Sequence, residues 1–276
     1  MEQLWFWLVS VTVALYAVLD GFDLVAGSLH LFVARTDAER RHVLEAIGPW
    51  WDGNEVWLLA GGGTLFLAFP GVLASGFSGF YLALFLVLWG LILRGIGIEF
   101  RSHLKDRLWR AFWDAVFASA SVLLPVLLGA ALGNVVRGVP LDASGYFNIP
   151  LFTDFSARPP VGILDWYTVL MGGFALLTLA GHGALFLAWK CEGPVQSRAH
   201  RGGFSLWLTI LALWAVVTVA TAKVRPEVFQ GWKAQPLAWA ATAVYALGLL
   251  AVLFGLRRGR HLVAFLHPHQ THALRR

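Results

Sequence analysis

Apolar side chains run in stretches of about twenty residues along almost the whole chain, with short polar segments between them. Stretches of this length can cross the hydrocarbon core of a bilayer as helices. The pattern predicts about seven membrane-spanning helices. Their expected ranges are Leu4–Val33, Trp50–Phe69, Phe77–Ile98, Phe112–Val136, Gly162–Trp189, Phe204–Ala222 and Leu237–Leu256.

The composition leads to the same fold class. Hydrophobic residues make up 58% of the 276 and charged residues only 13%, too few to solubilise so much apolar surface. We therefore predict an all-α integral membrane protein with a single polytopic domain. Within it we expect a first four-helix bundle (1–136), an external loop rich in Gly, Pro and aromatic residues (137–161), a second, incomplete helix group (162–256) and a tail (257–276).

The basic residues indicate the orientation. Most Lys and Arg residues follow the first, third, fifth and seventh predicted helices, and none lies between the second and the third. By the positive-inside rule the N-terminus is expected outside and the C-terminus in the cytoplasm. The net charge of +5 then reflects topology, and no nucleic-acid partner is expected. The early apolar run lacks a basic leader, so no cleavable signal peptide is expected.

The stretch YAVLDGFDLVAG places Asp20 and Asp23 inside the first apolar run. A carboxylate at the centre of a membrane helix costs about 2.5–3.5 kcal/mol on insertion scales. A carboxyl that ionises when a proton leaves could serve a proton relay. The alternative is that one or both residues hydrogen-bond a neighbouring helix and fix its register. Ala17 and Gly21 are spaced to let such a helix approach closely.

The stretch GPWWDGNEVW opens the second predicted helix and contains Asp52, Asn54 and Glu55. Asp52 followed three residues later by Glu55 resembles a capping box. The same side chains could instead form a polar mouth where protons enter. The two roles do not exclude each other.

The stretch RGIGIEFRSH, at the end of the third helix, contains Arg94, Glu99 and His103. We predict a structural ion pair between Arg94 and Glu99, and a contact between Glu99 and His103 at spacing four. His182 is expected to hydrogen-bond within the bundle. The histidines of HPHQTH (267–272) have no fixed geometry, and CxxCH is absent. No metal or haem ligation by this chain is expected.

Several motifs occur in order along the chain. They are YAVLDGFDLVAG, GPWWDGNEVWLLAGGGTLFLAFP, FSGFYLALFLVLWGLILRGIGIEFR, GILDWYTVLMGG and HGALFLAWKCEG. Together they resemble subunit II of cytochrome bd-type quinol oxidases, in the cyanide-insensitive oxidase branch. The resemblance extends from about Leu4 to Leu256.

The resemblance implies a subunit of the bacterial plasma (inner) membrane without activity of its own. Its implied partner is a subunit I that holds two b-type haems and one d-type haem, oxidises quinol and reduces dioxygen to water. A small single-helix subunit and a structurally bound quinone or lipid are further implied partners. This chain would ligate no haem, would support subunit I and would share in proton supply. Asp20, Asp23 and Asp52 match positions proposed to conduct protons, and Glu55 adjoins them.

One feature departs from the family. Members carry eight helices as two four-helix bundles, but here RRGRHLVAFLHPHQTHALRR follows the seventh. Leu262–Leu266 is too short to span a bilayer, so the last helix is expected to be missing. There are two alternative interpretations. One is a proton-coupled secondary transporter, which is disfavoured because few other polar residues lie centrally in the predicted helices. The other is a purely structural scaffold.

Overall fold

The computed structural model describes residues 1–259, except for the side chains of 233–234. This part of the chain contains only helices and irregular connections. The helices are α1 (Glu2–Leu19), α2 (Gly21–Leu24), α3 (Ala26–Val33), α4 (Asp37–Ile47), α5 (Trp51–Ala68), α6 (Pro70–Gly79), α7 (Tyr81–Phe100), α8 (Arg107–Arg137), α9 (Trp166–Lys190), α10 (Gly193–Val224), α11 (Pro226–Ala234) and α12 (Pro236–Arg257). The predicted tail, with Leu262–Leu266 and the histidines of 267–272, lies beyond the described residues, apart from its first three.

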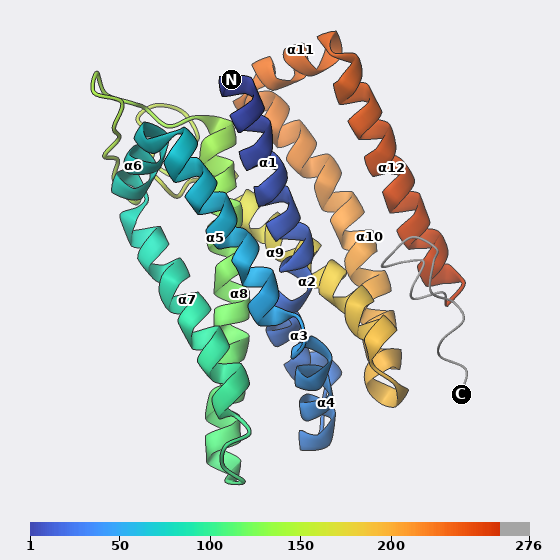
Figure 1. The fold of residues 1–276 in the computed structure, drawn as a ribbon. Coiled ribbons are helices and arrows are strands. Elements are labelled where there is room, and N and C mark those ends of the chain that lie inside the picture. The colour runs from blue at the N-terminus through green and yellow to red at the C-terminus, as the bar shows by residue number, and fades with distance from the viewer. Residues whose placement is uncertain (260–276) are drawn as a thin grey trace.

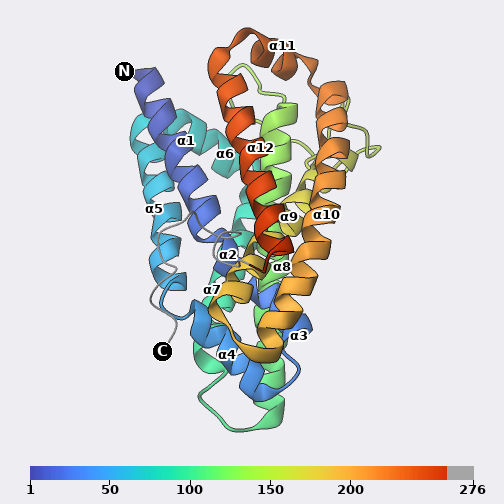
Figure 2. The same ribbon diagram turned by 90° about the vertical axis from the view of Figure 1, so that its right-hand side faces the viewer.

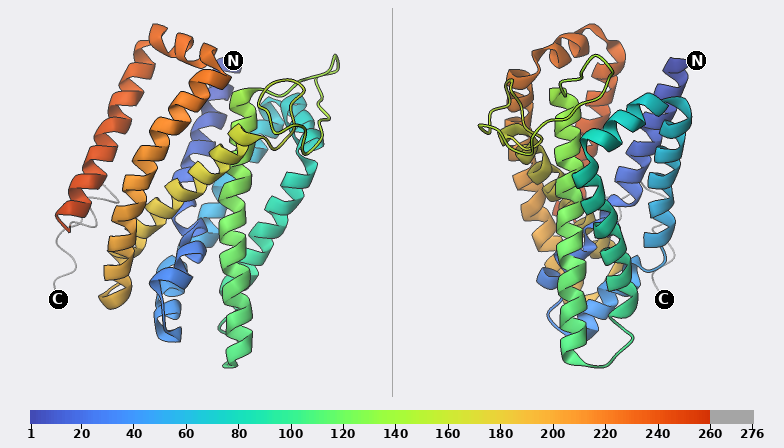
Figure 3. Two further views of the ribbon diagram at one scale, coloured as in Figure 1. Left: turned by 180° about the vertical axis from the view of Figure 1, so that it is seen from behind. Right: turned by 90° about the vertical axis from the view of Figure 1, so that its left-hand side faces the viewer.

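The lengths of the helices confirm an all-α membrane protein. Six described helices are long and apolar enough to cross a bilayer, and α5 with α6 makes a seventh if this bent pair counts as one span. The N-terminus and the last residues of α12 lie at opposite ends of the bundle (Figures 1 and 2). α8 packs against α7 and α9, and α9 also packs against α10 (Figure 3). α9 thus lies between α8 and α10.

The first predicted span is not one continuous helix. It breaks at Asp20 and again at Val25, which separates α1, α2 and α3. An apolar run predicts insertion but does not reveal such breaks, because they depend on side chains of other helices that bond the freed backbone groups. Gly21 lies in this broken region, and a Cβ there would come within 2.8 Å of Leu179 on α9. The predicted close approach of a neighbouring helix is therefore confirmed at Gly21.

The second predicted span ends in a sharp bend. α6 turns by 118° from α5 and begins at Pro70, whose missing N–H suits the first position of a helix. The third predicted span, expected from Phe77, therefore begins at Tyr81, since Phe77 belongs to α6. Figure 1 places α6 across the end of the bundle where the N-terminus lies.

The connection between α8 and α9 is bonded to the last turns of α8 at the end that precedes α9. Asn134 donates to the carbonyl of Ile163 at 2.9 Å, and Arg137 donates to the carbonyl of Gly162 at 3.0 Å. Arg137 also forms a buried ion pair with Asp165, the residue that caps α9. This loop is thus held against the two central helices.

Candidate functional site

Arg94 of α7 lies at the centre of a buried ionic cluster, and its side chain is fully buried. Its Nη2 is 2.6 Å from Oδ1 of Asp23 and 3.6 Å from Oδ1 of Asp20. Its Nη1 is 2.5 Å from Oε1 of Glu55 on α5. One cation thus faces three carboxyl groups, which come from the broken first span and from α5. We call these four residues the Arg94 cluster.

The two aspartates of the cluster differ in their hydrogen bonds. Asp23 accepts from Nη2 of Arg94 and, through Oδ2, from Nδ2 of Asn54 at 2.7 Å. Both oxygens of Asp20 are buried and make no hydrogen bond of normal geometry with any described residue. Tyr16, one turn earlier, has a buried hydroxyl in the same condition. The Tyr16 hydroxyl and the Asp20 carboxyl interact with each other, whereas Asp23 is bonded to Arg94 and Asn54.

Side chains from α5 and α9 bond the backbone where α1 ends. Nδ2 of Asn54 donates to the carbonyl of Leu19 at 2.8 Å, and Nε2 of His182 donates to the carbonyl of Val18 at 3.1 Å. Carbonyls at a helix end need such partners in a bilayer, because water is absent. The prediction that His182 hydrogen-bonds within the bundle is confirmed. The role of Asn54 in holding the break was not predicted.

Glu55 connects the Arg94 cluster with the surface. α5 begins at Trp51, so Asp52 lies within its first turn, and no side chain caps this helix. The predicted capping box is therefore not formed, since the Glu55 carboxylate reaches Arg94 instead. The Glu55 side chain is 25% exposed, and Asp52 is exposed. The two carboxyls lie on the first turns of α5, with Asp52 outermost.

Glu99 and His103 lie apart from Arg94. Among the described residues the ion pairs of Arg94 go to Asp20, Asp23 and Glu55, so the expected pair with Glu99 is not observed. Five residues along a helix correspond to a rotation of about 140°, which turns Glu99 away from the face that carries Arg94. Glu99 is exposed, and its backbone carbonyl, not its carboxylate, accepts from Nδ1 of His103 at 2.9 Å.

A second ionic cluster, which the sequence did not suggest, centres on Asp114 of α8. Its Oδ1 accepts from Nε of Arg101 at 2.5 Å and lies 3.1 Å from Nε2 of His30. Its Oδ2 accepts from Nη1 of Arg40 at 2.8 Å. Arg101 also reaches Asp37 at 2.8 Å. One signal was present: Asp114 interrupts an apolar helix, as Asp20 does.

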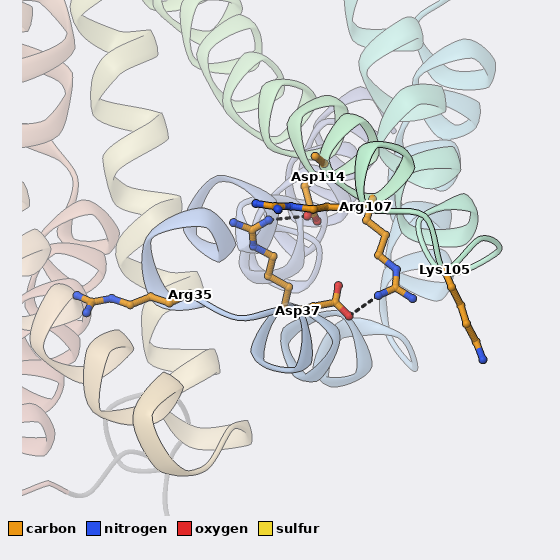
Figure 4. A pocket seen from close by; sticks show the side chains of 8 residues that line it. Arg35, Asp37, Lys105, Arg107 and Asp114 are labelled. Atoms are coloured by element: carbon orange, nitrogen blue, oxygen red, sulfur yellow. Dashed lines mark hydrogen bonds and ion pairs between the residues drawn. The ribbon is translucent and has the colours of Figure 1, made fainter.

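A pocket of about 440 Å³ opens beside the Asp114 cluster (Figure 4). It lies at the end of the bundle where α4 and the α7–α8 connection meet, opposite the N-terminus (Figure 1). Its lining is rich in cationic side chains. The lining residues are Arg35, Asp37, Arg40, Lys105, Arg107, Arg110, Ala111 and Asp114.

The charge of one nearby surface group is fixed by its neighbours. Glu39 of α4 forms an ion pair with Arg198 of α10 at 2.6 Å. This interaction, together with the backbone N–H groups of Arg35 and Thr36, lowers the pKa of Glu39 from 4.5 to about 2. Glu39 is therefore ionised at neutral pH and links α4 to α10. In residues 1–259 no three His, Cys, Asp or Glu side chains gather to hold a metal ion.

Fold and site together define a multi-pass helical membrane protein whose first helix group encloses a buried cluster of one arginine and three carboxyls. The chain matches the family described as cytochrome bd terminal oxidase subunit II over residues 1–272, and it belongs to that family.

Curated relatives agree with this assignment. Over 219 residues the chain is 35% identical to cytochrome bd-I ubiquinol oxidase subunit 2 of Escherichia coli K12. This aligned region covers 79% of this chain and 56% of that protein. Over 202 residues it is 35% identical to cytochrome bd ubiquinol oxidase subunit 2 of Bacillus subtilis 168, covering 73% and 57%. A probable cytochrome oxidase subunit 2 of Haemophilus influenzae is 36% identical over 199 residues, covering 72% and 51%. The chain thus spans about half the length of the curated relatives it matches.

Proposed function

We propose that this chain acts as a subunit of a membrane-bound quinol:dioxygen oxidoreductase and contributes a path for protons to its partner. Its membership of the subunit II family supports the first part, and the Arg94 cluster supports the second. The partner would be a haem-bearing subunit I with two b-type haems and one d-type haem. The complex would lie in the bacterial plasma membrane, with the N-terminus of this chain outside. A small single-helix subunit and a bound quinone or lipid complete the proposed assembly.

The proton path rests on the charge balance of the Arg94 cluster. Three ionised carboxyls around one guanidinium would leave excess negative charge buried, which is unfavourable unless a group becomes neutral. Asp23 has the guanidinium and the Asn54 amide as donors, and Glu55 has the guanidinium and partial exposure to water. Asp20 makes no hydrogen bond of normal geometry with a described residue, although its carboxyl lies close enough to Tyr16 and Asp23 to interact with them. Under the proposal, the carboxyl that exchanges a proton is Asp20, because of the three it lies farthest from the guanidinium, at 3.6 Å.

The order of the residues gives the path its direction. Asp52 is exposed, Glu55 is a quarter exposed, and Asp20 is fully buried. Under the proposal, protons enter at Asp52 and Glu55 and reach Asp20, which exchanges its proton with a bound water or with the partner. Asp23 and Arg94 hold the geometry and the local charge. Oxygen reduction consumes the protons at a site outside this chain.

The test is the variant Asp20→Asn in the intact complex. The amide keeps the size of the side chain but cannot ionise, so oxygen consumption with quinol should collapse while the haem content of the purified complex stays normal. Glu99→Gln, which neutralises an exposed carboxyl outside the cluster, serves as the matched control and should leave both quantities unchanged. If haem content falls with activity in Asp20→Asn, the residue is structural, as the scaffold alternative requires. If activity persists, the path does not use Asp20.

A further inference from the structure

We propose that the pocket beside the Asp114 cluster binds the phosphate group of an anionic membrane lipid. The proposal is independent of the proton path, because the pocket and the Arg94 cluster have no residue in common. It follows from the charges that line the pocket, from the carboxylates that are already paired and from the apolar side chains that flank it.

The carboxylates of the pocket are already paired with arginines of the same region. Asp114 receives donors on both oxygens from Arg101, Arg40 and His30. Asp37 receives Arg101 on Oδ1 and Nη1 of Arg110, at 2.7 Å, on Oδ2. Each carboxylate is thus shared between two arginines. The described structure shows neither carboxylate paired with the remaining cations of the lining.

Those remaining cations are Arg35, Lys105 and Arg107. None of the three forms an ion pair with a described residue, and all are exposed. Arg35 and Lys105 lie on opposite sides of the pocket, with Asp37 and Asp114 between them, and their side chains point outward at its rim (Figure 4). Long cationic side chains around a concave surface are suited to a phosphate, because each N–H makes a charge-assisted hydrogen bond to an anionic oxygen.

Large apolar side chains lie next to these cations and favour a lipid over a free anion. On α8, Leu108 is 80% exposed and Phe112 is 58% exposed, and both stand beside pocket residues Arg107 and Ala111. On α3, Phe32 is 77% exposed, three residues before Arg35. These side chains belong to helices that enter the apolar part of the bundle at this point. A headgroup phosphate in the pocket would place acyl chains along them, whereas inorganic phosphate would use none of this surface.

The pocket also has a rigid base. Arg101 and Asp114 are each about 2% exposed and join α3, α4, α7 and α8 beneath the cationic rim. Substitutions at the rim leave those ion pairs untouched. The proposal can therefore be tested without disturbing the fold.

The experiment compares lipid binding by the purified complex and its variants with native mass spectrometry. The probe is dioleoyl phosphatidylglycerol, titrated in detergent with dioleoyl phosphatidylcholine as the neutral reference. Lys105→Gln combined with Arg107→Gln should weaken phosphatidylglycerol binding about thirtyfold, since each of the two basic residues near an anionic surface contributes about 1 kcal/mol. Arg41→Gln is the control, because Arg41 is an exposed residue of α4 outside the pocket and should bind like the unmodified protein. Arg107→Lys, which keeps the charge, should retain most of the binding.

Three results would overturn the proposal. Equal binding of phosphatidylglycerol to the double variant and to the unmodified protein would show that the lipid does not use these residues. Binding of phosphatidylcholine as tight as that of phosphatidylglycerol would show that no anionic lipid is required. Displacement of the lipid by inorganic phosphate at equal concentration would make the pocket a site for a free anion.

Discussion

Asp23→Asn and Asp20→Asn should affect the stability of the protein very differently, although the two residues are three positions apart. Asp23 accepts from Arg94 at 2.6 Å and from Asn54 at 2.7 Å. Asp20 makes no hydrogen bond of normal geometry to a described residue and lies 3.6 Å from Arg94. The same chemical change therefore removes a strong interaction at one position and only a weak one at the other.

The structure sets the size of each effect. Removing one partner of a buried ion pair costs about 3–5 kcal/mol, because the other charge stays buried. Arg94 keeps Glu55 at 2.5 Å after Asp23→Asn, so the expected loss lies near the lower limit, about 3 kcal/mol. Asp20→Asn replaces a carboxyl that is neutral under the proton-path proposal by an amide of equal size. Its expected loss is about 1 kcal/mol or less, no more than one ordinary hydrogen bond contributes.

Thermal unfolding of the purified protein in detergent, followed by tryptophan fluorescence in size-exclusion chromatography, measures both effects. Asp23→Asn should lower the melting temperature by several degrees, whereas Asp20→Asn and the control Glu99→Gln should stay close to the unmodified protein. Equal shifts for the two aspartates, or a larger shift for Asp20, would refute the reasoning. Either result would mean that Asp20 carries the charge that Arg94 balances.

Two further predictions concern helix packing and surface charge. Gly129→Ala should destabilise the protein by about 1–3 kcal/mol in the same melting assay, because the new Cβ would lie 2.8 Å from the carbonyl of Met171 on α9. Gly173→Ala, where a Cβ meets nothing within 4 Å, should be neutral, and equal losses would contradict the close packing of α8 on α9. Glu39→Gln should lower the melting temperature at neutral pH. The folded pKa of Glu39 is lowered to about 2 from 4.5. The difference in melting temperature between Glu39→Gln and the unmodified protein should therefore be fully present above about pH 4.5 and fade as the pH falls toward 2. A difference in melting temperature that is independent of pH would exclude the ion pair with Arg198 as its source.

The sequence predicts the membrane spans well because hydrocarbon imposes a length and an apolar composition on each of them. The expected span Leu237–Leu256 and the observed α12 differ by one residue at each end. The breaks within a membrane span cannot be predicted in the same way. The break at Asp20 depends on Asn54 and His182, which lie in other helices, and no local pattern around Asp20 indicates those partners.

For the candidate site, too, the sequence indicates some residues but not the partners that they bind. The cost of burying a carboxyl points to Asp20 and Asp23 from the sequence alone, and it would have pointed to Asp114 if applied there too. The residues that pair with these carboxyls could not be predicted in this way. Arg94 and Glu99 are close in sequence, yet Arg94 pairs with residues 71 and 39 positions away, because the rotation of α7 turns it toward α2 and α5.

The break in the first span and the Arg94 cluster depend on each other. An unbroken helix would bond the Leu19 carbonyl within its own backbone and leave the Asn54 amide only Asp23 to bond. Because the helix breaks, one amide bonds the carbonyl of Leu19 and the carboxylate of Asp23 together. Asn54→Leu should therefore release both groups at once and cost more than the loss of either bond alone, since each would stay buried without a partner. Asp20 lies at the break itself, and under the proton-path proposal it is the residue of the cluster that exchanges a proton.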